Sequence, residues 1–150
     1  MGIISNLGRM DQDKAAKYVG IGILLAIIFG SAIMVSKSLY DNATAWQDDA
    51  DNKALLERNL GIISEAEYQI RQIENEKAYY LMRLQALYVT NIGKIGVNIG
   101  LFLVFIGFVG LGINGSGDEK TRRLFLTIAA IVIFVMMFTT FFSGISITLV

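Results

Sequence analysis

The sequence predicts an all-α integral membrane protein: three transmembrane helices, with a long antiparallel helical hairpin between the first and second spans. Three observations predict this fold. They are three charge-free runs, a polar stretch of 58 residues that holds only two glycines, and the absence of proline from all 150 residues. The chain is 54% hydrophobic and 17% charged, so its charged content lies well below that of soluble domains.

The charge-free runs predict the spans. They cover residues 18–36, 95–117 and 124–150, which are 19, 23 and 27 residues long. A helix rises about 1.5 Å per residue, so each run is long enough, or nearly so, to cross about 30 Å of hydrocarbon. We expect spans at 18–36, 95–114 and 124–150, with a short turn-rich loop at 115–123. The first run exceeds the apolar part of a signal peptide, so we expect it to be retained.

Residues 1–17 precede the first span and mix apolar with charged positions. This pattern predicts an amphipathic segment on the membrane surface, and a partly ordered tail is the alternative.

Residues 37–94 form the only sizeable polar region. Gly61 and Gly93 are its only strong helix breakers. Ser64 followed by Glu67 has the spacing of a capping box, which starts a helix just after Gly61. We therefore expect two antiparallel helices with a turn near residues 59–62. The alternative is an irregular loop with one amphipathic helix over residues 64–88.

An apolar series in the hairpin predicts a helix-packing seam. Its members recur at steps of three and four with Lys77 in the middle, which is the heptad spacing of packed helices. The predicted seam residues are Trp46, Ile63, Ile70, Ile73, Tyr80, Leu84 and Leu87.

Small residues predict close helix packing inside the membrane. Gly96 and Gly100 form a small-xxx-small pair, which lets two helices approach closely. This glycine face lies about opposite the seam, so one helix would have partners on two sides. The glycine face packs either against the chain's own spans or against another subunit. The small residues are Gly93, Gly96, Gly100 and Gly107 in the second span and Thr140, Gly144 and Thr148 in the third.

The residues that are missing exclude several functions. Cysteine and histidine are absent, so no thiolate nucleophile, catalytic triad with histidine or Cys/His zinc site can form. No charged residue lies inside a predicted span, whereas proton relays and coupled transporters generally need one. The acidic cluster at residues 48–51 lacks the glycine and glutamate of a calcium loop. We therefore expect no enzyme activity, no cofactor and no metal.

Charge also predicts partners and orientation. Thirteen basic residues balance thirteen acidic ones, so we expect no nucleic acid as a partner. Basic residues crowd the first 17 positions and the loop between the second and third spans, which predicts a cytoplasmic N-terminus with the hairpin and C-terminus on the opposite side. We expect a multi-pass protein of a bacterial inner membrane or a plasma membrane. The six basic residues are Arg9, Lys14, Lys17, Lys120, Arg122 and Arg123.

Two functions fit these features. The first is a structural or accessory subunit of a membrane complex, which assembles through its hairpin and its glycine-rich second span. Its partners would be membrane lipid and other membrane-protein subunits or copies of itself. The alternative is a small homo-oligomeric channel with the glycine-rich span near the axis.

Overall fold

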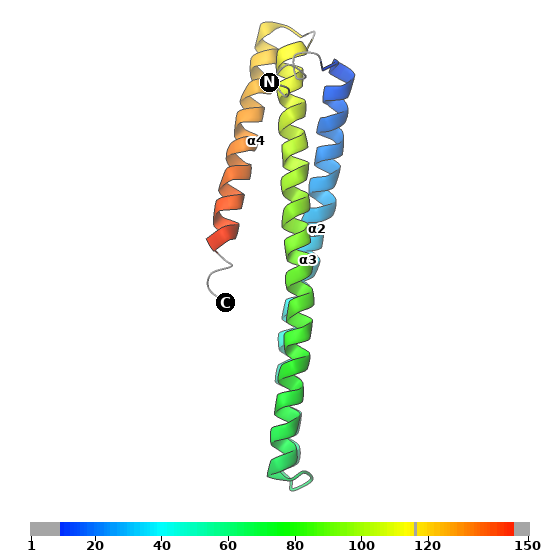
Figure 1. The fold of residues 1–150 in the computed structure, drawn as a ribbon, viewed down its shortest axis with the longest axis vertical. Helices are drawn as coiled ribbons and strands as arrows, with labels where there is room; N and C mark the ends of the chain where they lie inside the picture. Colours follow the sequence, from blue (N-terminus) through cyan, green and yellow to red (C-terminus); the bar gives the residue numbers. More distant parts are fainter. Residues whose placement is uncertain (1–9, 116, 146–150) are drawn as a thin grey trace, which may run out of the picture. The chain divides into compact units, whose positions relative to one another are not determined.

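The computed structural model describes residues 10–115 and 117–145, and their side chains up to residue 138. The described residues form three helices and no strand: α2 (Gln12–Asn59), α3 (Glu65–Asn114) and α4 (Glu119–Ile145) (Figure 1). Residues 1–9, the larger part of the predicted surface segment, lie outside this description.

All three helices are long enough and apolar enough to cross a membrane, by length and composition. α2 has 48 residues and α3 has 50, which correspond to about 70–75 Å each. Both are much longer than a bilayer requires, because each continues from an apolar stretch into a polar one. In α4, the part that is long enough and apolar enough to cross a membrane is Glu119–Phe138.

The chain divides into two compact units. The apolar unit comprises the described parts of residues 1–30 and 94–150, and the hairpin unit is Ser31–Gly93. α2 and α3 are each divided between the two units, with one part of the helix in the apolar unit and the other part in the hairpin unit. α4 belongs to the apolar unit alone.

The hairpin unit reverses at Gly61, as predicted. Gly61 has a φ of 71°, in the left-handed region that glycine adopts without steric cost. Its N–H donates to the Arg58 carbonyl (3.0 Å), and the Ile62 N–H donates to the Glu57 carbonyl (2.9 Å). These two bonds form a Schellman motif, which satisfies carbonyl groups at the end of α2 that have no partner within the helix.

The predicted capping box at the start of α3 is confirmed. The Glu67 carboxylate accepts hydrogen bonds from the Ser64 N–H (2.8 Å) and hydroxyl (2.9 Å), and the Glu67 N–H donates to the Ser64 hydroxyl oxygen (3.3 Å). The bond from the Ser64 N–H, then that from its hydroxyl, and to a smaller extent the charge of Arg71, hold the pKa of Glu67 below its ordinary value of 4.5. The turn and the cap together leave only residues 60–64 outside the helices.

The two helices of the hairpin unit contact each other through small residues. Ser36, Ala43 and Ala54 of α2 are buried, and so is Ala86 of α3. Ser36 and Ala43 are seven residues apart, which is the repeat that keeps one helix face against a neighbour. Small side chains allow a close approach, and among the buried residues of this unit they outnumber the large ones, of which Ile63 is an example.

Polar contacts join the two helices near the turn. Arg71 forms an ion pair with Glu57, and the Asn75 amide donates to the Asp51 carboxylate at 3.0 Å. The Arg58 guanidinium lies 4.5 Å from the centre of the Tyr68 ring. These pairs fix the antiparallel register close to Gly61.

Of the large apolar residues that the sequence predicts in the seam, the structure buries one and leaves the others partly exposed. Ile63 is buried, but Ile70 is 56% exposed and Leu84 is 47% exposed. The physical reason is that Ala86 and Gly93, which are buried and seven residues apart, lie on another face of α3, where small residues allow a closer helix approach. The other predicted seam residues that the structure leaves exposed are Trp46, Ile73, Tyr80 and Leu87.

In the apolar unit, α4 is attached to the end of α3 by hydrogen bonds and ring contacts. The Arg122 guanidinium donates from Nε to the Gly112 carbonyl (3.1 Å) and from Nη2 to the Ile113 carbonyl (2.9 Å). The rings of Phe108 and Phe125 lie 6.0 Å apart. In Figure 1 the yellow end of α3 lies between α2 and α4. Arg122 therefore closes the carbonyl end of α3 from the first turn of the next helix.

The start of α4 is capped by Asp118. Its carboxylate accepts a hydrogen bond from the Thr121 N–H at 3.1 Å. Hydrogen bonds from the Thr121 side chain and backbone lower the pKa of Asp118 from its ordinary value of 3.8. The negative charge at this helix N-terminus is favourable because the N–H groups there carry partial positive charge.

Candidate functional site

The glycine face of α3 lies against α2 of the same chain. A Cβ on Gly96 would overlap the ring of Phe29, and a Cβ on Gly100 would lie 2.8 Å from the Ala26 nitrogen. A Cβ on Gly107 would lie 2.7 Å from the Ala15 carbonyl oxygen. Of the two alternatives that the sequence left open, the structure therefore shows packing within the chain. Gly93, which belongs to the hairpin unit, is also buried.

The small residues predicted in the third span cannot be placed in the same way. Thr140 and Gly144 lie in α4 beyond the last described side chain, and Thr148 lies outside the described residues altogether.

The outer face of α3 in the hairpin unit carries most of the predicted seam. We call this face the outer stripe. All its members are exposed, and they follow one another at steps of three and four residues. They are Ile70, Ile73, Lys77, Tyr80, Leu84 and Leu87.

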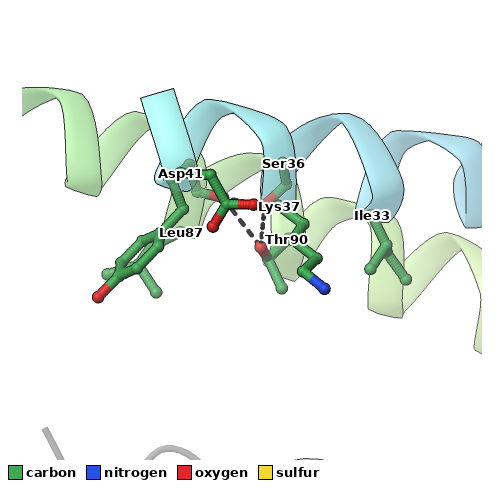
Figure 2. A pocket seen from close by; sticks show the side chains of 8 residues that line it. Ile33, Ser36, Lys37, Asp41, Leu87 and Thr90 are labelled. Atoms are coloured by element: carbon green, nitrogen blue, oxygen red, sulfur yellow. Dashed lines mark hydrogen bonds between the residues drawn. The ribbon is translucent and has the colours of Figure 1, made fainter. Parts of the chain in front are cut away.

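A groove of about 440 Å³ lies between α2 and α3 in the hairpin unit. Its floor holds a buried polar contact: Ser36 is 3% exposed, and its hydroxyl donates to the Ala86 carbonyl at 2.8 Å and also hydrogen-bonds to the Thr90 hydroxyl. The Thr90 hydroxyl in turn lies 2.9 Å from the same carbonyl. Figure 2 shows Lys37 and Asp41 on the same side of the helices as Thr90. The lining residues are Ile33, Ser36, Lys37, Tyr40, Asp41, Ala86, Leu87 and Thr90.

The two hydroxyls of the groove are held by hydrogen bonds within the hairpin unit. The Ser36 and Thr90 hydroxyls bond to each other and to the Ala86 carbonyl, so neither hydroxyl is activated by a neighbouring base. Lys37 and Asp41 are exposed and stand one helical turn apart. Within the described residues, no group of three or more acidic side chains is arranged to hold a metal ion.

Sequence reasoning missed three of the residues that organise these sites. The sequence does not indicate Ser36 or Thr90, because a lone hydroxyl in a helix carries no periodic signal. The sequence indicates Arg122 only as a basic residue of the loop, although its position four residues after Asp118 is compatible with a contact to the end of the preceding helix.

No protein-family model, curated protein or solved structure matches the chain.

Proposed function

We propose that the protein is a structural subunit of an oligomeric membrane complex, and that it assembles through the outer stripe of its hairpin. The observation that carries the proposal is the exposure of large apolar side chains at heptad spacing on α3, such as Ile70 and Leu84. Contiguous exposed apolar surface of this kind marks an interaction site. The inner face of the same helix is already occupied by α2, so the outer stripe needs a partner from outside the chain.

The heptad spacing of the outer stripe favours a helix as that partner, and we propose a second copy of the chain. Two copies inserted in the same direction would align their α3 helices in parallel. Lys77 would then stand at a core position, and the flanking Glu76 of each copy would lie beside the Lys77 of the other. A lysine within an otherwise apolar stripe sets the register of such a pair at a cost in stability.

Cysteine crosslinking tests this proposal, because the chain has no native cysteine. Leu84→Cys places a thiol on the outer stripe, and we expect oxidation in membranes to give a disulfide dimer of this variant. Gln85→Cys is the matched control: Gln85 is also exposed, but it points about 100° away around the helix. Efficient dimers from both variants, or from neither, would overturn self-association through the outer stripe.

Native mass measurement of the wild-type chain separates the remaining outcomes. A complex of two or more copies supports the proposal. A complex with a different protein, together with no Leu84→Cys dimer, would replace the second copy by another subunit. A lone chain of 16.5 kDa would refute the subunit function itself.

The proposal includes a membrane location with three spans, a cytoplasmic N-terminus, and the hairpin and C-terminus on the opposite side. Three long apolar helices support the spans, and the basic residues near the N-terminus and at 120–123 support the orientation. In intact cells, we expect a membrane-impermeant maleimide to label Lys53→Cys and to leave Lys120→Cys unlabelled. The reverse pattern would invert the topology.

The proposed role is structural rather than enzymatic or conducting. A channel would need the glycine face of α3 near its axis, but Gly96, Gly100 and Gly107 contact α2. We therefore do not propose the channel alternative.

A further inference from the structure

The groove of the hairpin unit lies where α2 leaves its apolar stretch. Lys37 is the first charged residue after the charge-free residues 18–36, and Ile33 of the same groove still belongs to that stretch. If the apolar stretches cross a membrane, as the proposed function holds, this groove lies at the depth of lipid head groups. The apolar side chains that line the groove and its charged rim then face two different parts of a lipid molecule.

We propose that this groove binds one ethanolamine phospholipid, with the head group at Lys37 and Asp41 and the upper acyl chain along the apolar lining. Ile33, Ala86 and Leu87 provide that lining. The groove has room for part of a lipid but not for all of it, at about 440 Å³. The acyl chain would therefore leave the groove toward the bilayer.

The charges at the rim match a zwitterion. Lys37 and Asp41 are one helical turn apart on one side of α2 (Figure 2), and no ion pair between them is present in the described part of the chain. The Lys37 ammonium suits a phosphate, and the Asp41 carboxylate suits a primary ammonium that can donate hydrogen bonds. An ethanolamine phospholipid carries both groups, whereas a glycerol head group lacks the cation and a choline head group lacks the N–H donors.

The buried hydroxyls give the groove its shape. The bonds from Ser36 to Ala86 and Thr90 hold α2 and α3 together at the groove floor. At the rim, the Arg83 guanidinium of α3 lies 5.4 Å from the centre of the Tyr40 ring of α2, a cation–π contact between the two helices. The groove is therefore formed by the hairpin itself and needs no second chain.

Native mass spectrometry of the detergent-purified full chain tests the proposal. Equal amounts of dioleoyl phosphatidylethanolamine, phosphatidylglycerol and phosphatidylcholine are added, and the retained lipids are identified. We expect one phosphatidylethanolamine to be retained about three- to tenfold more than either of the other lipids, which is the net effect of one ordinary hydrogen bond at an exposed rim. Equal retention of the three lipids, or no retention, would overturn the proposal.

Two substitutions test the two halves of the head-group site. Asp41→Asn should reduce phosphatidylethanolamine to the level of phosphatidylcholine, and Lys37→Gln should weaken retention of all three lipids. Asp49→Asn and Lys53→Gln make the same changes at exposed positions elsewhere in α2 and should alter nothing. Unchanged selectivity in Asp41→Asn would refute the zwitterion site and leave a simple contact between Lys37 and phosphate.

The lipid measurement is independent of the oligomer measurement. Leu87 is the one lining residue of the groove that also belongs to the outer stripe. Leu84 belongs to the outer stripe but does not line the groove. The Leu84→Asp variant should therefore separate the two copies and leave the groove intact. We expect this variant to retain phosphatidylethanolamine as the wild type does. Loss of the lipid preference in Leu84→Asp would refute a groove within one chain. A wild-type chain that does not self-associate but keeps its preference for phosphatidylethanolamine would refute only the oligomer.

Discussion

Gly22 of α2 and Gly100 of α3 face each other so closely that neither has room for a side chain. A Cβ on Gly100 would lie 2.7 Å from the Gly22 carbonyl oxygen, and a Cβ on Gly22 would lie 2.5 Å from the Gly100 carbonyl oxygen. Such an approach brings two backbones together, which only glycine permits at both positions. The contact is the clearest evidence that the glycine face stabilises the chain's own fold.

We predict that Gly100→Leu destabilises the packing of α2 against α3 by about 1–3 kcal/mol or more, because the new side chain must push the helices apart. Thermal denaturation in detergent, followed by protease sensitivity, measures the effect. Gly20→Leu is the control, since nothing lies within 4 Å of a Cβ at Gly20. If Gly100→Leu removes an oligomer but leaves the unfolding temperature unchanged, the glycine contact lies between chains instead.

Gly61→Ala should destabilise the hairpin by about 1–2 kcal/mol, because at a φ of 71° the alanine Cβ would lie too close to the following carbonyl oxygen. Chemical denaturation of the full chain, followed by circular dichroism, measures the loss. Gly30→Ala serves as the comparison. Gly30 lies inside α2 with open space around it, so alanine there should be neutral or slightly stabilising. Equal effects of the two substitutions would contradict the role of Gly61 in the turn.

The cap at Glu67 should make the start of α3 sensitive to acid. The folded-state pKa of Glu67 is lowered, so its contribution to stability is complete above the ordinary value of 4.5 and is lost as the pH falls through the folded-state value. We expect thermal unfolding of the wild type to become easier below that pH, and we expect a smaller change in Glu67→Gln. The same pH dependence in both proteins would exclude Glu67 as its source.

Arg122→Gln should loosen the junction of α3 and α4. Glutamine cannot reproduce the two guanidinium bonds to the Gly112 and Ile113 carbonyls, so we expect a loss of about 1–2 kcal/mol and faster amide exchange in the first turn of α4. Arg123→Gln is the matched control, because the Arg123 guanidinium bonds to the exposed Glu119 carboxylate of the same helix turn and not, among the described residues, to the end of α3. The cap assignment fails if Arg123→Gln has the larger effect.

The turn of the hairpin could be predicted from the sequence because its determinants are local. Gly61 needs no distant partner to adopt a positive φ, and Ser64 and Glu67 bond to each other across three residues. The helices could be predicted for the same reason, since breakers are absent from long stretches. Each of these inferences depends on neighbours along the chain.

The choice of packing face could not be predicted, because α3 has two faces with the same repeat. Ile70 and Leu84 lie on one and Ala86 on the other. If large apolar residues are taken to mark the packing face, the first face is predicted to contact α2. The close approach of α2 depends instead on the small side chains of the second face. The groove could not be predicted either, because it depends on a hydrogen bond between Ser36 and Thr90, which are 54 residues apart in the chain.

The seven-residue repeat of the inner face restricts how the hairpin can vary in length. Ser36 and Ala43 are seven residues apart and both are buried, whereas Ala50, after a further seven residues, is half-buried. Removing one residue between them would rotate the rest of the arm by about 100° and turn its alanines away from the partner. Removing seven would restore the facing positions one repeat further along. Insertions and deletions in homologous hairpins should therefore come in multiples of seven and occur in both arms together.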